Sequence, residues 1–240
     1  MCTVIYIPFS GGAMFSSCRD ENPARARALQ PGLIESVSGT MLFPADTEKG
    51  GTWIGLHEKG HLLVLLNGGF ETHQRLEKYR KSRGLIVKDL LDKEDPLKEW
   101  NSSDLYEVEP FTLVLWQKGK LFELVWDGNV KHSTKKNELV PAIWSSSTLY
   151  DPLVKQKRKR WFNSWLAGLS HPSTENIYQL LWQHNDKEDG FIMNRQTIRT
   201  LSISLVEISS GHGNFHYHDM ITGKRYSTTL TLNTKYETAG

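Results

Sequence analysis

The sequence begins "MCTVIYIPFS", and its cysteine at position 2 could act as a nucleophile. Aminopeptidases remove an initiator Met when the next side chain is small, and the mature chain would then begin with Cys2. The thiolate is the attacking form of cysteine. The ordinary pKa of the thiol is about 8.5, and that of a free α-amine is about 7.7–8.0. The amine of Cys2 could therefore accept the proton of its own thiol.

The segment "SSCRDEN", residues 16–22, lies where it could assist that chemistry. Residues 4–17 contain two runs of strand-forming residues on either side of a Ser-Gly-Gly turn, which predicts a β-hairpin. A short turn places the far end of the second strand beside the start of the first. We therefore expect Asp20 to hold the α-ammonium group and Arg19 to lower the pKa of the Cys2 thiol. The structural alternative is a solvated charged turn.

Asn67 ends the apolar run "HLLVLLN" and precedes two glycines. At the end of a buried strand, its amide could donate a hydrogen bond to an oxyanion that forms on a substrate carbonyl. An asparagine before two glycines is also a common turn residue. Trp53 and Trp144 lie next to candidate site segments, so they are predicted to line a pocket for an apolar acyl group.

Paired strands and a few helices must position these residues. Hairpin patterns recur along the chain, and Gly60 is predicted to have a positive φ in one of the turns. Asp151 and Pro152 form a helix start, as N-cap and first helical residue. The predicted strands are 52–56, 61–67, 111–116, 121–126, 198–208, 214–220 and 226–232, and the predicted helices begin near residues 84, 152 and 173. Strands and helices in separate groups predict an α+β layered domain.

Composition limits the classes of protein. The chain has 240 residues, of which 38% are hydrophobic and 23% charged, which is typical of one soluble globular domain over residues 1–240. The net charge of +2 is too small to indicate nucleic acid or an anionic membrane as the main partner. No stretch approaches the 18 apolar residues of a membrane span. The two cysteines fit a reducing compartment, and we expect a cytoplasmic protein.

Two further patterns have competing interpretations. The run "KQKRKRW", residues 155–161, could bind nucleic acid or acidic lipid, but Val154, Phe162 and Trp165 define a buried helix face, so we interpret the basic residues as solvated helix surface. The histidines of "HGNFHYH", at positions 212, 216 and 218, could share a metal ion. They adjoin a turn with no cysteine nearby, which favours a half-exposed strand and no metal site.

Several motifs together resemble the NRDE (transport and Golgi organisation 2-like) family. These are "MCTV", "SCRDENPARARAL", "FPADTEKGGTWIGLHEKGHLLVLLNGGF" and "YRKSRGLIV", which occur in the order typical of the family. The family is similar to the N-terminal nucleophile (Ntn) hydrolases, which form a four-layer αββα sandwich of two antiparallel sheets flanked by helices. Its opening resembles the cysteine-type branch, which implies Cys2 as nucleophile, Arg19 and Asp20 as its supporting pair, and Asn67 as oxyanion donor.

The sequence departs from the family pattern at two positions. Cys18 stands where the family name implies Asn, and a thiol bonds more weakly than an amide. In "WSSSTLYDP", Ser146 stands where relatives carry an Asn that assists the reaction in the hydrolases. A serine can still donate a hydrogen bond, with a shorter reach. The late arginine of the family corresponds to Arg199, with Arg195 as the alternative.

The sequence thus predicts an amidohydrolase of the Ntn type that attacks a non-peptide carbon–nitrogen bond of a small molecule. It needs no metal or organic cofactor. The alternative is a protein that uses the same scaffold to bind and move a ligand without turnover, since relatives are linked to haem movement and to lipid or acyl-CoA metabolism. For haem, Cys2, Cys18 or a histidine would be the axial ligand.

Overall fold

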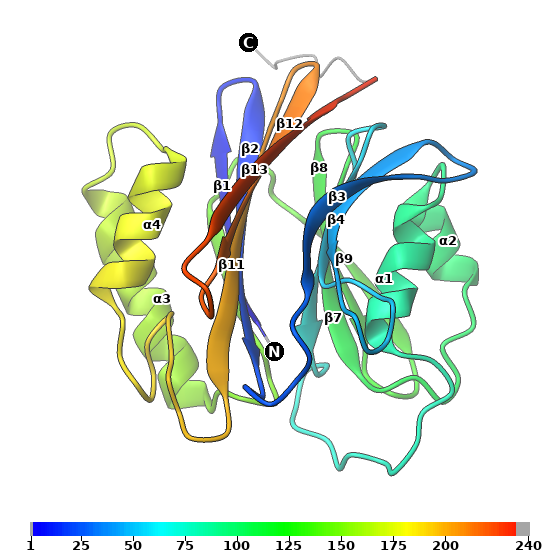
Figure 1. Ribbon diagram of the computed structural model, residues 1–240, viewed down its shortest axis with the longest axis horizontal. Helices are drawn as coiled ribbons and strands as arrows, with labels where there is room; N and C mark the ends of the chain where they lie inside the picture. Colours follow the sequence, from blue (N-terminus) through cyan, green and yellow to red (C-terminus); the bar gives the residue numbers. More distant parts are fainter. Residues whose placement is uncertain (1, 234–240) are drawn as a thin grey trace.

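Two antiparallel β-sheets face one another, and a pair of helices covers the outer face of each sheet (Figure 1). The structure is a computed structural model that describes residues 2–233, and for Cys2 it describes the main chain. The arrangement confirms the predicted α+β fold with four αββα layers. Each sheet buries one face on the other sheet and the opposite face on helices, which satisfies the apolar residues on both sides of its strands.

The first sheet joins the beginning of the chain to its end. Its six strands lie in the order β10-β1-β2-β11-β12-β13. The predicted hairpin at the N-terminus is confirmed as β1 and β2, and the last three predicted strands are confirmed as β11, β12 and β13. The bounds are β1 Cys2–Phe9, β2 Gly12–Glu21, β10 Ala142–Ser145, β11 Arg199–Ser209, β12 His212–Asp219 and β13 Arg225–Thr231.

The second sheet is a meander of seven strands in sequence order, β3 to β9. The predicted hairpins β5–β6 and β7–β8 are confirmed, and Gly60 has the predicted positive φ, at 78°. Strands β3, β4 and β9 escaped sequence analysis. The bounds are β3 Leu29–Glu35, β4 Thr40–Ala45, β5 Ile54–His57, β6 Leu62–Asn67, β7 Phe111–Gln117, β8 Lys120–Trp126 and β9 Lys131–Lys136.

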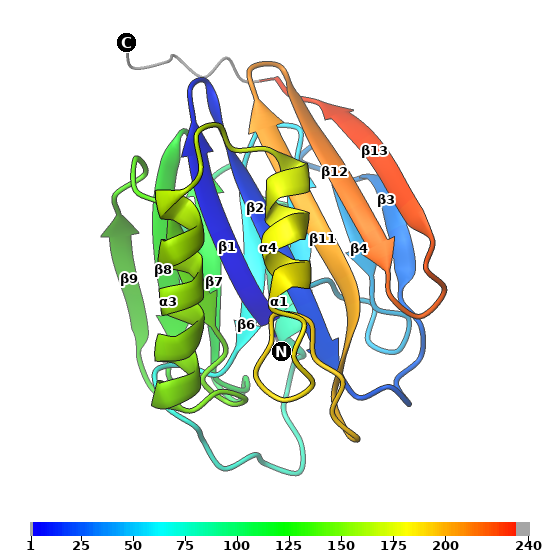
Figure 2. The same ribbon diagram turned by 90° about the vertical axis from the view of Figure 1, so that its left-hand side faces the viewer.

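Helices α3 (Pro152–Ala167) and α4 (Thr174–Gln183) lie over the first sheet (Figure 2). The predicted N-cap of α3 is confirmed, because the Asp151 carboxylate accepts the main-chain N–H groups of Leu153 and Val154. Helices α1 (Arg83–Leu91) and α2 (Pro96–Ser102) cover the second sheet. Sequence analysis missed α2, which spans only 7 residues.

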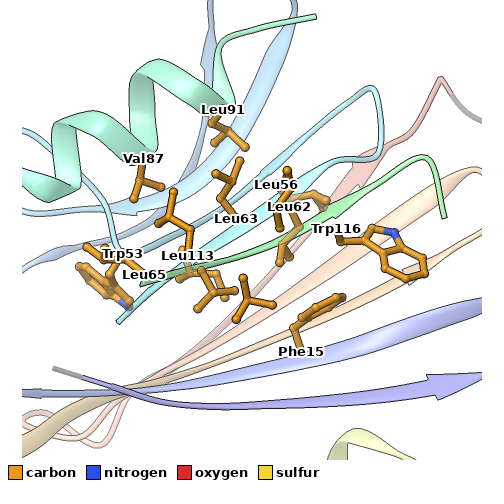
Figure 3. Packing of buried hydrophobic residues seen from close by; sticks show 14 of the residues in the cluster. Phe15, Trp53, Leu56, Leu62, Leu63, Leu65, Val87, Leu91, Leu113 and Trp116 are labelled. Carbon is orange, nitrogen blue, oxygen red and sulfur yellow. The ribbon is translucent and has the colours of Figure 1, made fainter. Parts of the chain in front are cut away.

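The larger core lies on both faces of the second sheet. In Figure 3, Leu63 of β6 points toward Val87 and Leu91 of α1, while Trp116 of β7 lies on the side of Phe15 from the first sheet. The Trp116 and Phe15 ring centroids are 6.0 Å apart. Strand β6 is buried from Leu62 to Leu66, as its unbroken run of apolar residues predicted.

No helix in the described part of the chain is both long enough and apolar enough to cross a bilayer.

Candidate active site

The start of β1 lies against the end of β2. Cys2 is the register partner of Arg19, and Thr3 is the partner of Cys18. The hairpin thus brings the main chain of the proposed nucleophile beside the segment that was expected to assist it. Cys18, which stands at the family's Asn position, is a buried part of the core beneath α3 and α4.

Arg19 projects into the space between the two sheets. Its Nη2 donates to Oδ2 of Asp46 over 3.0 Å, and its guanidinium carbon lies 4.4 Å from the ring centroid of Trp53. Arg25 donates to the same carboxylate oxygen over 2.9 Å. Burial acts to raise the pKa of Asp46, but the bond from Arg25, the main-chain N–H of Lys49 and the two arginine charges outweigh it and lower the pKa. Asp46 is therefore a carboxylate that fixes Arg19.

Asp20 lies on the opposite face of the first sheet, because successive residues of a strand point to opposite sides. Its carboxylate is fully buried and accepts the hydroxyl of Thr200 at 2.6 Å and that of Tyr150 at 2.8 Å. Burial raises the pKa of Asp20, and the Thr200 bond, the positive charge of Arg158 and the Tyr150 bond oppose that rise. Arg19 and Asp20 are thus held by two different sets of partners.

A cavity of about 570 Å³ opens beside Arg19. Trp53 and Asn67 also line it, so three of the predicted site residues meet there. Among the described residues, the lining holds eight lysines or arginines and four acidic residues. The basic ones are Arg19, Arg25, Lys49, Arg75, Lys78, Arg80, Lys81 and Arg83, and the acidic ones are Glu21, Asp46, Glu77 and Glu109. The excess of cations makes the cavity favourable for an anionic ligand.

Ser146 and Trp144 line a second cavity, of about 170 Å³. The Ser146 hydroxyl donates to the main-chain carbonyl of Asn67 over 2.7 Å, and the Trp144 indole N–H donates to the carboxylate of Glu123. The structure therefore does not bring these two predicted substrate-binding residues to the cavity beside Arg19. Ser146 bonds instead to Asn67, the last residue of β6.

Arg199 is exposed at the start of β11, where it is the register partner of Glu21. It does not belong to the described lining of either cavity. Arg195, the alternative for the family's late arginine, is bound to the carbonyl of Glu188. Neither residue makes a described contact with Asp20.

Arg158 of α3 was missed by sequence analysis, and the interpretation of the basic run as solvated surface is wrong for this residue. Arg158 is fully buried, whereas Lys159 and Arg160 are exposed. The signal was present in the spacing, since position 158 lies four residues from both Val154 and Phe162 and therefore on the helix face assigned to the core. The sequence interpretation failed because it assumed that a charged residue does not lie on the core-facing side of a helix.

The three histidines of β12 differ in solvent exposure: His212 is exposed, His216 is half-buried and His218 is buried. No three histidine, cysteine or acidic residues among those the structure describes form a group that could hold a metal ion.

The fold defines the structural class of the protein. The chain shares the fold of Ntn hydrolases: two crystal structures of variants of the conjugated bile acid hydrolase from Clostridium perfringens each match with a TM-score of 0.55 and 10% identity, covering 95% and 99% of this chain and 92% and 98% of theirs. The Caenorhabditis elegans N-acylethanolamine-hydrolyzing acid amidase ortholog matches with a TM-score of 0.56 and 11% identity, covering 85% of this chain and 92% of that one.

Within this class, the chain belongs to the Transport and Golgi organisation 2 family, which it matches over residues 14–237. The resemblance to the NRDE family is thereby confirmed. The matched region begins after Cys2, so it includes Arg19, Asp20 and Asn67 but not the proposed nucleophile. No curated protein matches the sequence.

Proposed function

We propose that this protein is an N-terminal cysteine amidohydrolase that cleaves a non-peptide carbon–nitrogen bond of a small molecule in the cytoplasm. The observation that carries the proposal is the β1–β2 register, in which the main chain of Cys2 lies opposite Arg19, a residue that lines the 570 Å³ cavity. The similarity in fold to a bile acid hydrolase and an acid amidase supports an amidase-like reaction.

In this proposal, removal of Met1 frees the α-amine of Cys2, which accepts the thiol proton. The sulfur attacks the substrate carbonyl, and the Asn67 amide stabilises the oxyanion. The carbon–nitrogen bond breaks, the leaving amine takes the proton, and a thioester remains. Water then adds to the thioester carbonyl, so that the carboxylic acid leaves and the thiol is restored.

Arg19 has a defined role in the proposed reaction. Its positive charge favours the thiolate of the residue opposite it in the register and thereby lowers the pKa of that thiol. The Asp46 carboxylate and the Trp53 ring hold the guanidinium in one place. Arg199 is exposed, and this scheme gives it no role.

Mass spectrometry tests the proposal most directly. The intact mass of the purified protein reports whether Met1 is removed, and a thiol-reactive acylating probe reports whether the label resides on Cys2. A panel of fluorogenic N-acyl amides then measures turnover. We expect Cys2→Ser to lose at least about 100-fold in rate, whereas Cys18→Ala, the matched change at the other cysteine, retains activity. Full turnover by Cys2→Ser would contradict the proposal.

The charge of the cavity favours a second candidate function, the binding and transfer of an anionic ligand such as an acyl-CoA without turnover. Haem is the other ligand to test, with Cys2, opposite Arg19, or Tyr79 of the described lining as its axial ligand. Titration with acyl-CoA and with haem, followed by absorbance and calorimetry, separates the functions. Stoichiometric binding with no acyl transfer to Cys2 would favour the carrier.

A further inference from the structure

Arg158 is a fully buried cation in a layer of otherwise apolar contacts. It lies on the face of α3 that packs on the first sheet, one helical turn before the buried Phe162. A buried charge persists in a folded protein when hydrogen bonds and an opposite charge compensate for the lost hydration. The partners of Arg158 therefore indicate what its position accomplishes.

Each of the three nitrogens of the guanidinium group donates a hydrogen bond. Nε donates to the carbonyl of Asp189 over 2.8 Å, and Nη2 donates to the carbonyl of Gly190. Nη1 donates to the hydroxyl of Thr3 over 2.6 Å. The group also stacks on Tyr150, with the guanidinium carbon 3.6 Å from the ring centroid. A lysine could not reproduce this geometry, because an ammonium group has no planar fork and does not stack.

Tyr150 connects this cation to the buried carboxyl group of Asp20. Its ring lies against the Arg158 guanidinium, and its hydroxyl donates to Oδ2 of Asp20 over 2.8 Å. Burial raises the pKa of the Asp20 carboxyl, and the charge of Arg158 opposes that rise. Arg158 is thus the counter-charge of Asp20, and Tyr150 is the bridge between them.

The two ends of this network flank the proposed nucleophile. Thr3 is the next residue of the chain after Cys2, and it is buried in β1. Asp20 directly follows Arg19, the register partner of Cys2. Arg158 itself lies on the helix-covered face of the sheet, whereas the cavity beside Arg19 lies between the sheets. It can therefore act on the reaction only through Thr3 and Asp20.

We propose that Arg158 is a positioning residue for Cys2, which it serves by binding the hydroxyl of Thr3 and by holding, through Tyr150, the carboxylate of Asp20. The inference rests on the proposed function, in which Cys2 is the nucleophile. The charge of Arg158 favours the ionised form of Asp20, that form favours the ammonium state of the Cys2 α-amine, and the ammonium charge in turn favours the thiolate.

The test measures the reactivity of the Cys2 thiol itself. The rate of alkylation by iodoacetamide is followed from pH 5 to pH 10, with peptide mapping to separate Cys2 from the buried Cys18. We expect a wild-type midpoint below the ordinary thiol pKa of about 8.5. Arg158→Met and Tyr150→Phe should raise that midpoint by about one pH unit and lower the rate at pH 7 about tenfold. Arg158→Lys keeps the charge but loses the planar set of donors, so its midpoint should lie between those of the wild type and Arg158→Met.

Matched controls come from helices α3 and α4, which cover the first sheet. Arg160→Met removes an exposed arginine of α3, and Tyr178→Phe removes the hydroxyl of a buried tyrosine of α4 outside the network. Both should keep the wild-type midpoint. Circular dichroism and urea unfolding establish that each variant is folded. Tyr150→Phe keeps the ring beneath the guanidinium, so it decides the question if Arg158→Met does not fold.

The possible outcomes distinguish this inference from the proposed function. A low wild-type midpoint that stays unchanged in folded Arg158→Met and Tyr150→Phe overturns the role of Arg158 and leaves the nucleophile intact. A wild-type midpoint equal to that of the urea-unfolded protein overturns the activated nucleophile, and the role of Arg158 with it. A midpoint that rises in both variants and stays unchanged in both controls supports the inference.

Discussion

The hydroxyl of Ser146 donates a hydrogen bond to the main-chain carbonyl of Asn67 over 2.7 Å, and these two residues lie 79 positions apart in the chain. The contact joins the end of β6 to the segment after β10. Those two strands belong to different sheets. Ser146 therefore fixes the residue proposed to stabilise the oxyanion, although it does not line the same cavity.

Ser146→Ala should lower the free energy of unfolding by about 1–2 kcal/mol, because a poorly hydrated carbonyl loses its donor. The proposed hydrolysis should slow as Asn67 gains freedom. Urea unfolding monitored by tryptophan fluorescence measures the first effect. Ser147→Ala is the matched control, since its exposed hydroxyl makes a longer bond of 3.3 Å to the carbonyl of Glu71. Equal effects of the two substitutions would contradict the assignment.

Gly51 allows a loop to approach the start of α1 closely. A Cβ at Gly51 would lie 2.4 Å from the carbonyl carbon of Gly84, and the main-chain N–H of Thr52 donates to the Gly84 carbonyl over 3.0 Å. Main-chain atoms cannot move aside as a flexible side chain can. Both glycines also line the cavity beside Arg19.

Gly51→Ala should therefore destabilise the protein by about 1–3 kcal/mol, as overpacking generally does. Gly32→Ala is the control: a Cβ there meets nothing within 4 Å, and the residue lies in β3, where alanine costs no more than glycine. Thermal unfolding of both variants checks the prediction. A melting temperature for Gly51→Ala at or above that of Gly32→Ala would show that the loop has room to move.

The sequence predicted the hairpins well because their signals are local. The turn that contains Gly60 and the apolar run of β6 can each be recognised from fewer than ten consecutive residues. The missed strands β3 and β9 carry exposed or charged residues along most of their length, such as Lys131, Lys135 and Lys136 in β9. These edge strands pair because a neighbouring strand is already in place, and a pattern of polar residues gives no sign of that.

The candidate site was predictable where it follows from the hairpin or from a local motif, as for Trp53 and Asn67. The proximity of Arg19 to the start of the chain needed no knowledge beyond a short turn. The roles of Asp46 and Tyr150 depend on segments 27 and 130 residues distant from their partners, which no local pattern encodes. Arg158 was missed because the energetic rule against buried charge outweighed its helical spacing, and the Asp20–Tyr150 network that compensates for its burial becomes visible only in the folded chain.

His61 should make the stability of the protein depend on pH. Its ring is buried and stacked on that of His57, with centroids 4.6 Å apart, and its Nε2 donates to the carbonyl of Leu91 over 3.0 Å. Burial, with a contribution from the His57 charge, lowers the pKa of His61 from 6.5 to about 4. Burial also lowers the pKa of His57.

Between pH 6.5 and pH 4, the unfolded chain therefore binds a proton at His61 that the folded chain does not. The stabilising contribution of neutral His61 is fully present above pH 6.5. The free energy of unfolding should fall by about 3 kcal/mol as the pH decreases from 6.5 to 4. Urea unfolding at a series of pH values measures the slope. His61→Gln should flatten the slope, whereas His171→Gln, at an exposed histidine, should leave it unchanged. A slope unaffected by His61→Gln would assign the pH dependence to other groups.

The excess of cations in the cavity should appear as a preference for anionic ligands. Lys49 and Lys78 both line the cavity and are exposed, so each can be replaced without disturbing the core. Each charge reversal, Lys49→Glu or Lys78→Glu, should weaken binding of the anionic dye 8-anilinonaphthalene-1-sulfonate about two- to fivefold. The effect should be larger at low than at high salt, because screening reduces the attraction.

Two controls accompany this measurement. The neutral dye N-phenyl-1-naphthylamine is the matched probe. Lys120→Glu is the matched variant, because Lys120 is an exposed lysine of β8 outside the described cavity lining. If the charge reversals weaken both dyes equally, or if Lys120→Glu acts as strongly, the cavity does not select its ligand by charge.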